Sequence, residues 1–283
     1  MPTFRRWSLK YSVNEDFFDH WSGQMAYLLG FTFADGSIYK TSLSWDIQKR
    51  DLDLLEKINK IINSTYPISV RKRSCRLRIS NQIFIRGAVK RGLVPKKNMR
   101  DELPKIPERF IRHFVRGFLD GDGWIIIRTG RNEIDIGFSS GNNDILEILS
   151  SLIYRELGIL GKVRTKDKIT PRGIRAITRQ LEYYCLNAVE LADWLYGGLT
   201  TKDLYLKRKY YKYLKAKEIY NLSCKKFKGK RRIQKELGKS LKDILFGLYR
   251  NMGLNGMQIT KILGTSKSSV YRWLESTGVK YSK

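Results

Sequence analysis

The sequence predicts an α+β fold in which one helix–strand–strand–helix–strand–strand–helix unit occurs twice with pseudo-twofold symmetry, followed by a small all-α domain. The stretch GFTFADGSI at residues 30–38 returns as GFLDGDGWI at residues 117–125. Each copy is followed by segments in which apolar and polar residues alternate, which is the period of half-buried strands. The last part of the chain changes to a helical pattern, which separates it from the duplicated part.

Each repeated stretch predicts an apolar helix that ends at an aspartate. Residues 27–36 read YLLGFTFADG and residues 114–123 read FVRGFLDGDG, so Asp35 and Asp122 occupy the same position of the repeat. A carboxylate at that end of a helix is unfavourable by about a few tenths of a kcal/mol, because the helix carbonyl groups already carry partial negative charge. A cation bound there would remove the penalty.

The remaining elements follow in the same order in both copies. The segment DLLEKINKII at 53–62 corresponds to DILEILSSLI at 144–153, and each is followed by another strand region. Each copy then ends in a helical segment that stops at Gly-Leu, at 92–93 and at 198–199. Because Pro104 and Pro107 interrupt the pattern between the copies, we place the first repeat at 1–106 and the second at 107–220.

The charge of the chain indicates a polyanionic partner. Its 55 Lys and Arg residues against 27 Asp and Glu residues give a formal net charge of +28, and its hydrophobic content of 42% is too high for a disordered basic tail. Nucleic acid is the first expectation and an anionic membrane surface the second. The sequence has neither an apolar window of membrane-spanning length nor a signal-peptide pattern. We therefore expect a soluble, intracellular protein, cytoplasmic or organellar according to where the host DNA is, with no membrane partner.

The strand segments predict two antiparallel sheets, each with one polar face. In residues 39–48, Tyr39, Leu43, Trp45 and Ile47 alternate with polar residues, and basic residues occupy the hairpins that follow in both copies. Since a two-stranded ribbon fits the major groove, we predict that double-stranded DNA binds these faces; solvated surface charge is the alternative. The candidate DNA contacts on the sheets are Lys40, Ser42, Ser44, Arg71, Arg73, Arg76, Arg78, Arg164, Lys166, Arg175 and Arg179.

Small residues four positions apart in both repeated helices would let the two backbones nearly touch. These residues are Gly30, Ala34, Gly117 and Gly121. Such packing would bring Asp35 and Asp122 together at the base of the polar faces. The two carboxylates and the backbone carbonyl groups of Ala34 and Gly121 are hard oxygen ligands, which suit Mg²⁺. The alternative for a single copy is that Asp-Gly is an ordinary turn.

Both helices resemble the LAGLIDADG motif of homing endonucleases, in the form in which one chain carries two motifs. Residues 28–36 (LLGFTFADG) and 115–123 (VRGFLDGDG) hold its Gly, its last Asp and its final Gly, although the first copy has Phe33 where the second has Asp120. The flanking segments IQKR, GLVPKK and YLKRKY extend the resemblance over the duplicated part of the chain. It implies a monomer that cuts both strands of a long, asymmetric DNA site across the minor groove, leaves short 3′ overhangs and mobilises its own intron or intein-type element.

The resemblance also implies the chemistry of the site. Asp35 and Asp122 would bind two or three Mg²⁺ ions, and Ca²⁺ would bind without supporting cleavage. A metal-activated water attacks the phosphodiester, so that no protein nucleophile is needed.

By motif match, Lys97 and Lys207 would order water or stabilise the charge that develops on the phosphate. Gln48 and Lys49 would be further catalytic members of the same pocket. Because Lys96 and Lys202 align with each other in the repeat, the sequence leaves the choice among the lysines open.

Residues 221–241 predict a basic linker that lies along the phosphate backbone, with Lys230 and Arg231 as candidate contacts. Residues 242–283 then predict a small helical domain. Asn255 and Gln258 have capping-box spacing, and Ser266 would begin the last helix.

This domain resembles a resolvase-like helix-turn-helix, in which the last helix would read a major groove. A helical cap that packs on the nuclease is the alternative. The predicted core is Ile259, Ile262, Leu263, Val270 and Leu274, and the predicted DNA contacts are Lys267, Ser268, Ser269 and Arg272.

Two other functions fit the same sequence. A group of transcription regulators joins a degenerate LAGLIDADG fold to a helix-turn-helix and has lost the acids, whereas this chain keeps Asp35 and Asp122. An RNA maturase that assists intron splicing would use the same basic sheets for intron RNA, and the sequence does not separate it from the endonuclease.

Overall fold

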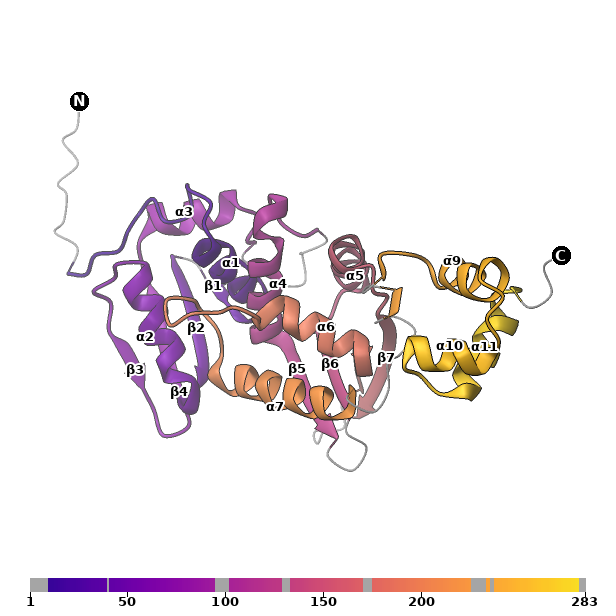
Figure 1. The fold of residues 1–283 in the computed structure, drawn as a ribbon. Helices are drawn as coiled ribbons and strands as arrows, with labels where there is room; N and C mark the ends of the chain where they lie inside the picture. The colour runs from indigo at the N-terminus through magenta and orange to yellow at the C-terminus, as the bar shows by residue number, and fades with distance from the viewer. Residues whose placement is uncertain are drawn as a thin grey trace. The chain divides into compact units, whose positions relative to one another are not determined.

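The computed structural model describes residues 10–39, 41–94, 102–128, 133–169, 175–224, 233–234 and 237–279. The chain divides into two compact units, Met1–Ala216 and Lys217–Lys283. Figure 1 shows the elements of both, and each unit is described by itself. Within the described residues, no helix has the length and hydropathy needed to span a membrane.

The first unit contains the predicted duplicated α+β unit, which confirms the fold class. The first copy consists of α1 (Gly23–Asp35), β1 (Ser37–Tyr39), β2 (Ser42–Gln48), the 3-10 turn η1 (Lys49–Asp51), α2 (Leu52–Ile61), β3 (Ile68–Val70), β4 (Ser74–Ile79) and α3 (Gln82–Lys90). The second copy consists of α4 (Glu108–Asp122), β5 (Gly123–Arg128), β6 (Glu133–Ser140), α5 (Asn143–Leu157), β7 (Lys162–Ile169), β8 (Arg175–Tyr184) and α6 (Cys185–Tyr196).

The two copies form matching four-stranded antiparallel sheets. The strand order is β1-β2-β4-β3 in the first sheet and β5-β6-β8-β7 in the second. In both, the second and fourth strands of the copy are central and pair with each other, as Trp45 opposite Leu77 and Phe138 opposite Leu181 illustrate. These four side chains are completely buried, so they mark the inner faces of the sheets.

The period of two along β2 places its side chains as predicted, with two exceptions near the hairpin. Leu43, Trp45 and Ile47 point into the core, but Tyr39 is 62% exposed and was wrongly assigned to the apolar face. The β1–β2 turn interrupts the alternation, so that Ile38 rather than Tyr39 points inward. Ser42, predicted to be on the wet face, is buried, and its hydroxyl donates to the Tyr39 carbonyl oxygen 3.2 Å away.

Helices α1 and α4 pack backbone to backbone, as their small residues predict. A Cβ atom on Gly30 would lie 2.1 Å from the Phe114 carbonyl oxygen, and one on Gly117 would lie 2.0 Å from the Tyr27 carbonyl oxygen. No larger residue fits at either glycine without moving the neighbouring helix. The two helices therefore run side by side through the core of the first unit (Figure 1).

A last helix, α7 (Lys207–Cys224), joins the two copies from the side before it crosses into the second unit. Its buried face in the first unit is formed by Lys209, Tyr213 and Ala216, which share one side of a helix. The Tyr213 ring stacks on Tyr196 of α6 at a centroid distance of 5.9 Å, and the Tyr213 hydroxyl donates to Asp193 at 2.7 Å. This packing fixes which side of α7 faces the end of α4.

The second unit is a small helical bundle made of α9 (Leu241–Phe246), the π-helical turn η3 (Gly247–Asn251), α10 (Gly256–Leu263) and α11 (Lys267–Ser276). The predicted capping box of Asn255 and Gln258 is present, and the Ser266 side chain accepts from the Ser269 N–H to begin α11. Gly264 ends α10 with a φ of 56°, a conformation that favours glycine.

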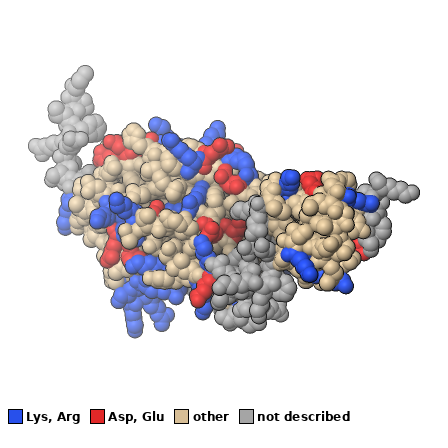
Figure 2. All heavy atoms as spheres, viewed as in Figure 1, with Lys and Arg blue, Asp and Glu red and all other residues tan. Residues whose placement is uncertain are grey.

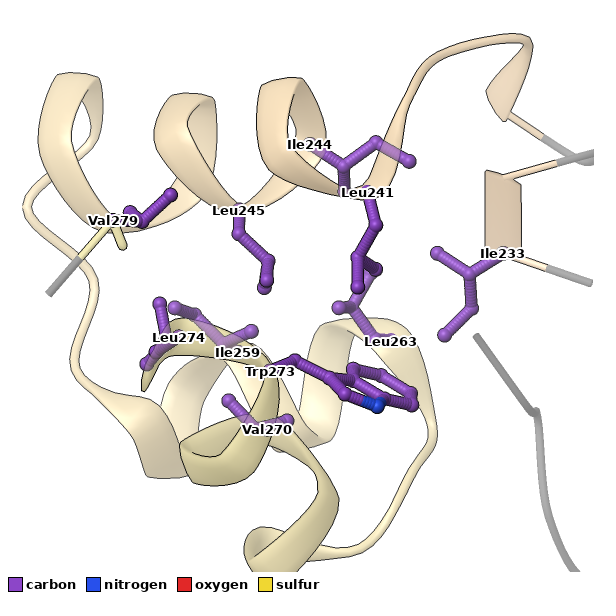
Figure 3. Packing of buried hydrophobic residues seen from close by; sticks show 10 residues of the cluster. All are labelled: Ile233, Leu241, Ile244, Leu245, Ile259, Leu263, Val270, Trp273, Leu274 and Val279. Atoms are coloured by element: carbon purple, nitrogen blue, oxygen red, sulfur yellow. The ribbon is translucent and has the colours of Figure 1, made fainter. Parts of the chain in front are cut away.

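The core of this unit differs from the predicted set at one position (Figure 3). Ile259, Leu263, Val270 and Leu274 are buried as predicted, but Ile262 is 54% exposed. Ile244 and Leu245, which the sequence predicts on one apolar stripe, also belong to this core. The remaining core residues were not assigned from the sequence: Ile233, Leu241, Trp273 and Val279.

Candidate metal centre and nucleic-acid interface

Asp35 and Asp122 are the last residues of α1 and α4, and the packing of these helices brings the two ends together. A Cβ atom on Gly121 would lie 2.5 Å from the Ala34 Cβ and 3.3 Å from the Asp35 backbone nitrogen. The residue before Asp122 thus touches the last two residues of α1. Among the described residues there is no cluster of three or more His, Cys, Asp or Glu side chains that would hold a metal. The candidate centre is the pair of carboxylates at these adjacent helix ends.

The position after each aspartate requires glycine for a steric reason. Gly36 and Gly123 leave the helix in extended conformation, and each donates its N–H back to a carbonyl group of the last turn, on Thr32 and Leu119. A Cβ atom would lie 2.6 Å from that carbonyl oxygen in both copies. The Asp-Gly pair therefore makes a tight exit from helix to strand, which places the carboxylate at the foot of the sheet.

Lys209 occupies the end of α4. Its ammonium donates to the carbonyl oxygen of Asp120 at 2.9 Å and of Gly123 at 2.7 Å, and also to that of Leu119. Burial lowers the pKa of Lys209 to about 8, against the attraction of nearby carboxylates such as Asp120. A built-in cation thus neutralises the negative end of α4. Sequence reasoning missed it, although its spacing from Tyr213 and Ala216 puts it on the buried face of α7.

The inner acid Asp120 has a structural role. Its carboxylate accepts from the Tyr27 hydroxyl at 2.8 Å, the Tyr196 hydroxyl at 2.7 Å and the Leu206 N–H at 2.9 Å, and burial raises its pKa. In the first copy Phe33 takes this position and packs against phenylalanine rings of α4. The replacement of this inner acid by Phe33 in the first motif therefore leaves the pair of helix-end aspartates unaffected.

The other candidate lysines make contacts with other residues or lie outside the described part of the chain. Lys207 forms an ion pair with Asp53 of α2 at 3.3 Å, and this hydrogen bond raises the pKa of Lys207. The carbonyl group of Lys202 accepts from Gln24 in the first turn of α1, whereas Asp35 is in its last turn. Lys96 and Lys97 are outside the described part of the chain.

Gln48 and Lys49 are exposed where β2 ends and η1 begins. Gln48 opposes Ser74 of β4 on the outer face of the sheet. They remain candidates for the pocket.

The outer face of the first sheet is polar and basic. Ser44 opposes Arg78, and Asp46 opposes Arg76 and forms an ion pair with it. Arg71 and Arg73 are exposed at the β3–β4 turn, where Figure 2 shows Lys and Arg side chains gathered. The predicted contacts other than Ser42 therefore share one accessible face, apart from Lys40, which lies outside the described residues.

The outer face of the second sheet mixes basic residues with carboxylates. Glu182 pairs with Arg164 at 3.4 Å and with Lys166 at 3.1 Å, and Asp135 pairs with Arg128 at 2.7 Å. The sequence placed Asp135 on the polar side of its strand and predicted basic hairpins, but it gave no sign that these carboxylates pair with the basic residues, because pairing across strands is not visible in the order of residues. Arg179 is half-buried on β8; Arg175 begins β8, but its side chain, like all of Lys230 and Arg231, lies outside what is described.

In the second unit, the exposed side of α11 carries Lys267, Ser268 and Arg272, as predicted. Ser269 is half-buried and accepts a hydrogen bond from the Ser266 hydroxyl at 2.8 Å. Tyr271 joins this surface, and a Cβ atom on Gly256 would lie 2.6 Å from its ring.

The comparison with protein families addresses the second copy. Residues 109–193, from α4 to α6, match the model described as a LAGLIDADG-like domain. The second repeat matches a LAGLIDADG-like domain. Its helix α4 ends in Asp122, and the first copy has the same order of elements and strands.

Solved structures with the same fold include a double mutant of I-SmaMI, which is 14% identical, covers 71% of this chain and 92% of its own, and has a TM-score of 0.51. Meganuclease I-SmaMI bound to uncleavable DNA is 15% identical over 71% of this chain and 91% of its own, with a TM-score of 0.47. Full-length DUF199/WhiA from Thermatoga maritima is 14% identical over 94% and 95%, with a TM-score of 0.44. No curated protein matches in sequence.

Proposed function

We propose that the chain is a site-specific double-strand DNA endonuclease of the LAGLIDADG homing type. The observation that carries the proposal is the placement of Asp35 and Asp122 at adjacent ends of two closely packed helices, each directly before a strand of a polar sheet. The LAGLIDADG-like match of residues 109–193 and the net charge of +28 support it. In such a monomer the two different sheets would bind the two halves of a long, asymmetric site.

The residues at the helix ends fit Mg²⁺. Two carboxylates, with the carbonyl groups of Ala34 and Gly121 beside them, form a hard oxygen donor set that leaves coordination positions for water and phosphate, as Mg²⁺ prefers. When bound, the metal supplies an activated water and a Lewis acid for phosphodiester hydrolysis.

The remaining residues would position the DNA. The outer faces of the sheets carry the side chains that contact base edges and phosphates, and Gln48 and Lys49 lie at the end of β2, where they would order water beside the phosphate. In the second copy Lys209 already holds the turn around Asp122 through the carbonyl groups of Asp120 and Gly123. Its role is therefore to orient that carboxylate rather than to touch the phosphate.

We further propose that the second unit is a helix-turn-helix that lengthens the contact with DNA. Helices α10 and α11 are joined by the short turn at Gly264, and α11 exposes Lys267, Ser268 and Arg272. Replacing both Lys267 and Arg272 by alanine should lower the slope of log affinity against log salt by roughly 1 to 2, because each phosphate contact contributes about 0.9. An unchanged slope would remove this unit from the interface.

Cleavage of a randomised double-stranded DNA library in Mg²⁺, with Ca²⁺ as the binding-only condition, tests the enzyme. Sequencing of the cut ends should give one long site with fixed 3′ overhangs. Asp35→Asn and Asp122→Asn should each reduce double-strand cleavage at least about 100-fold, since even residues that only support metal ligands contribute about 10- to 100-fold. DNA binding should change little.

The matched control is Asp144→Asn, which makes the same change at an exposed position in the first turn of α5. It should cut as the unmutated chain does. Full double-strand cutting by both helix-end variants would refute the proposed metal centre. Site-selective binding to DNA with no cut product would instead indicate the regulator, and preferential binding of structured intron RNA would indicate the maturase.

A further inference from the structure

The two outer faces can be compared position by position, because the Asp-Gly exit sets the same register in both sheets. In the first sheet, Ser37 follows Asp35-Gly36 and opposes Ser44 of β2. Ser44 in turn opposes Arg78 of β4. This row across the outer face ends in an exposed guanidinium.

The corresponding row of the second sheet has different chemistry. Trp124 follows Asp122-Gly123 and opposes Gly137 of β6, and Gly137 opposes Glu182 of β8. A Cβ atom on Gly137 would lie 2.1 Å from the Trp124 ring, so the indole occupies the space that a side chain at this position would need. Glu182 therefore stands where the first sheet has Arg78.

The Glu182 side chain is only 10% exposed, and its carboxylate is surrounded by donors. Its oxygens pair with Lys166 Nζ at 3.1 Å and Arg164 Nε at 3.4 Å, and the Tyr184 hydroxyl donates to it. Although burial alone would raise it, the pKa of Glu182 is lowered by these hydrogen bonds and positive charges. The carboxylate therefore stays charged at neutral pH.

The two cations remain accessible while their carboxylate partner does not. The side chains of Arg164 and Lys166 are 52% and 43% exposed. The ring of Trp124 lies 5.7 Å from Lys166 Nζ, and the ring of Tyr184 lies 5.7 Å from the Arg164 guanidinium carbon. A carboxylate and an aromatic ring thus restrain each cation on the outer face.

Resting on the proposed function, we propose that Glu182 is a specificity-determining positioning residue. It holds Arg164 and Lys166 in one arrangement, so that the second sheet binds its DNA half-site in a single register. Long basic side chains lose rotamer entropy when they are fixed, and the sheet has already ordered both side chains before DNA binds. The carboxylate also cancels charge that would attract any phosphate backbone, which weakens binding to unrelated DNA.

The test uses the full chain in Ca²⁺ and two duplexes, one selected from a randomised library by the unmutated chain and one unrelated. Glu182→Gln should raise affinity for the unrelated duplex by roughly 3- to 10-fold, steepen its salt slope by about 1 and lower the ratio of selected to unrelated affinity about 10-fold. Repeating the selection from the randomised library with Glu182→Gln should weaken the base preferences in only one half-site.

Glu108→Gln is the charge-matched control, because Glu108 is exposed in the first turn of α4, at the opposite end of that helix from Asp122. It should change both affinities less than about 2-fold. Tyr184→Phe removes one hydrogen bond to the carboxylate and keeps its charge, so it should lower the ratio without raising unrelated affinity. If Glu182→Gln lowers the Tm so far that binding cannot be measured, Tyr184→Phe still tests the positioning role.

The outcomes separate this inference from the proposed function. The positioning role would be overturned if Glu182→Gln and Glu108→Gln had equal affinities and salt slopes. It would also be overturned if Tyr184→Phe left the ratio of selected to unrelated affinity unchanged. Neither result would contradict the proposed endonuclease. Failure of the unmutated chain to prefer any duplex would overturn the proposed function itself, and this inference with it.

Discussion

Lys209 offers the sharpest test of how the second helix end is stabilised. Lys209→Met keeps most of the aliphatic stem but removes the ammonium that pairs with the carbonyl groups of Leu119, Asp120 and Gly123. Those carbonyl groups would lose their donor, and the buried Asp120 carboxylate would lose the cation whose charge lowers its pKa. The substitution should destabilise the first unit strongly.

The magnitude follows from the acceptors that the substitution leaves unpaired. Burial lowers the pKa of Lys209 from 10.5 to about 8, so the side chain is still mostly charged at pH 7. Its loss therefore removes a charged donor from three carbonyl groups and a cation from the neighbourhood of Asp120. Removing one partner of such a buried set costs about 3–5 kcal/mol, which corresponds to a fall in Tm of roughly 6–20 °C for a unit of this size.

Urea unfolding followed by tryptophan fluorescence measures the difference, with Lys207→Met as the matched control. Lys207 is half exposed, and its ion pair with Asp53 should contribute less than about 1 kcal/mol. If the free energy of unfolding falls by the same small amount in both variants, the ammonium of Lys209 does not stabilise the end of α4 and the reasoning is refuted.

Two further predictions concern the same pair of helices. Gly117→Ala should lower the free energy of unfolding by at least about 2 kcal/mol, since the new methyl group overlaps the Tyr27 carbonyl oxygen. The control Gly247→Ala adds a methyl group with nothing within 4 Å, so it should be neutral or stabilising in chemical denaturation. Equal effects of the two substitutions would mean that the helices separate easily. Burial and the charge of Arg116 lower the pKa of His113 from 6.5 to about 4, and Arg116, which can only donate, bonds to its Nδ1 at 3.1 Å. The folded protein therefore keeps His113 neutral while the unfolded chain takes up a proton, so stability should fall by about 1–2 kcal/mol as pH drops from 6.5 to 4. His113→Gln should flatten that part of the stability profile, and an unaltered slope would show that other groups cause it.

Features set by neighbouring residues could be predicted from the sequence alone. The duplicated helix ending at Asp35 and Asp122, the inward side of β2 and the capping box at Asn255 all depend on periods or spacings within a few residues. Close packing of α1 and α4 was also predictable, because only small residues such as Gly117 permit it. The α+β fold class rests on these local rules, applied twice.

Features that depend on which side of an element faces another required the tertiary structure. Lys207 and Lys209 are two positions apart on α7 and look alike in sequence, but the packing of Tyr213 turns Lys209 toward the end of α4 and leaves Lys207 near α2. The same holds for Ile262, which the sequence does not distinguish from its buried neighbours.

The pairing of charges across strands shows the difference most clearly. Glu182 is separated by a hairpin from Arg164 and Lys166, and the order of residues gives no sign that one carboxylate holds both. The sequence by itself determined that both sheets have a polar outer face. Only the register of the strands decided which of their charges meet, because side chains far apart in the chain become neighbours through backbone hydrogen bonds that no local pattern encodes.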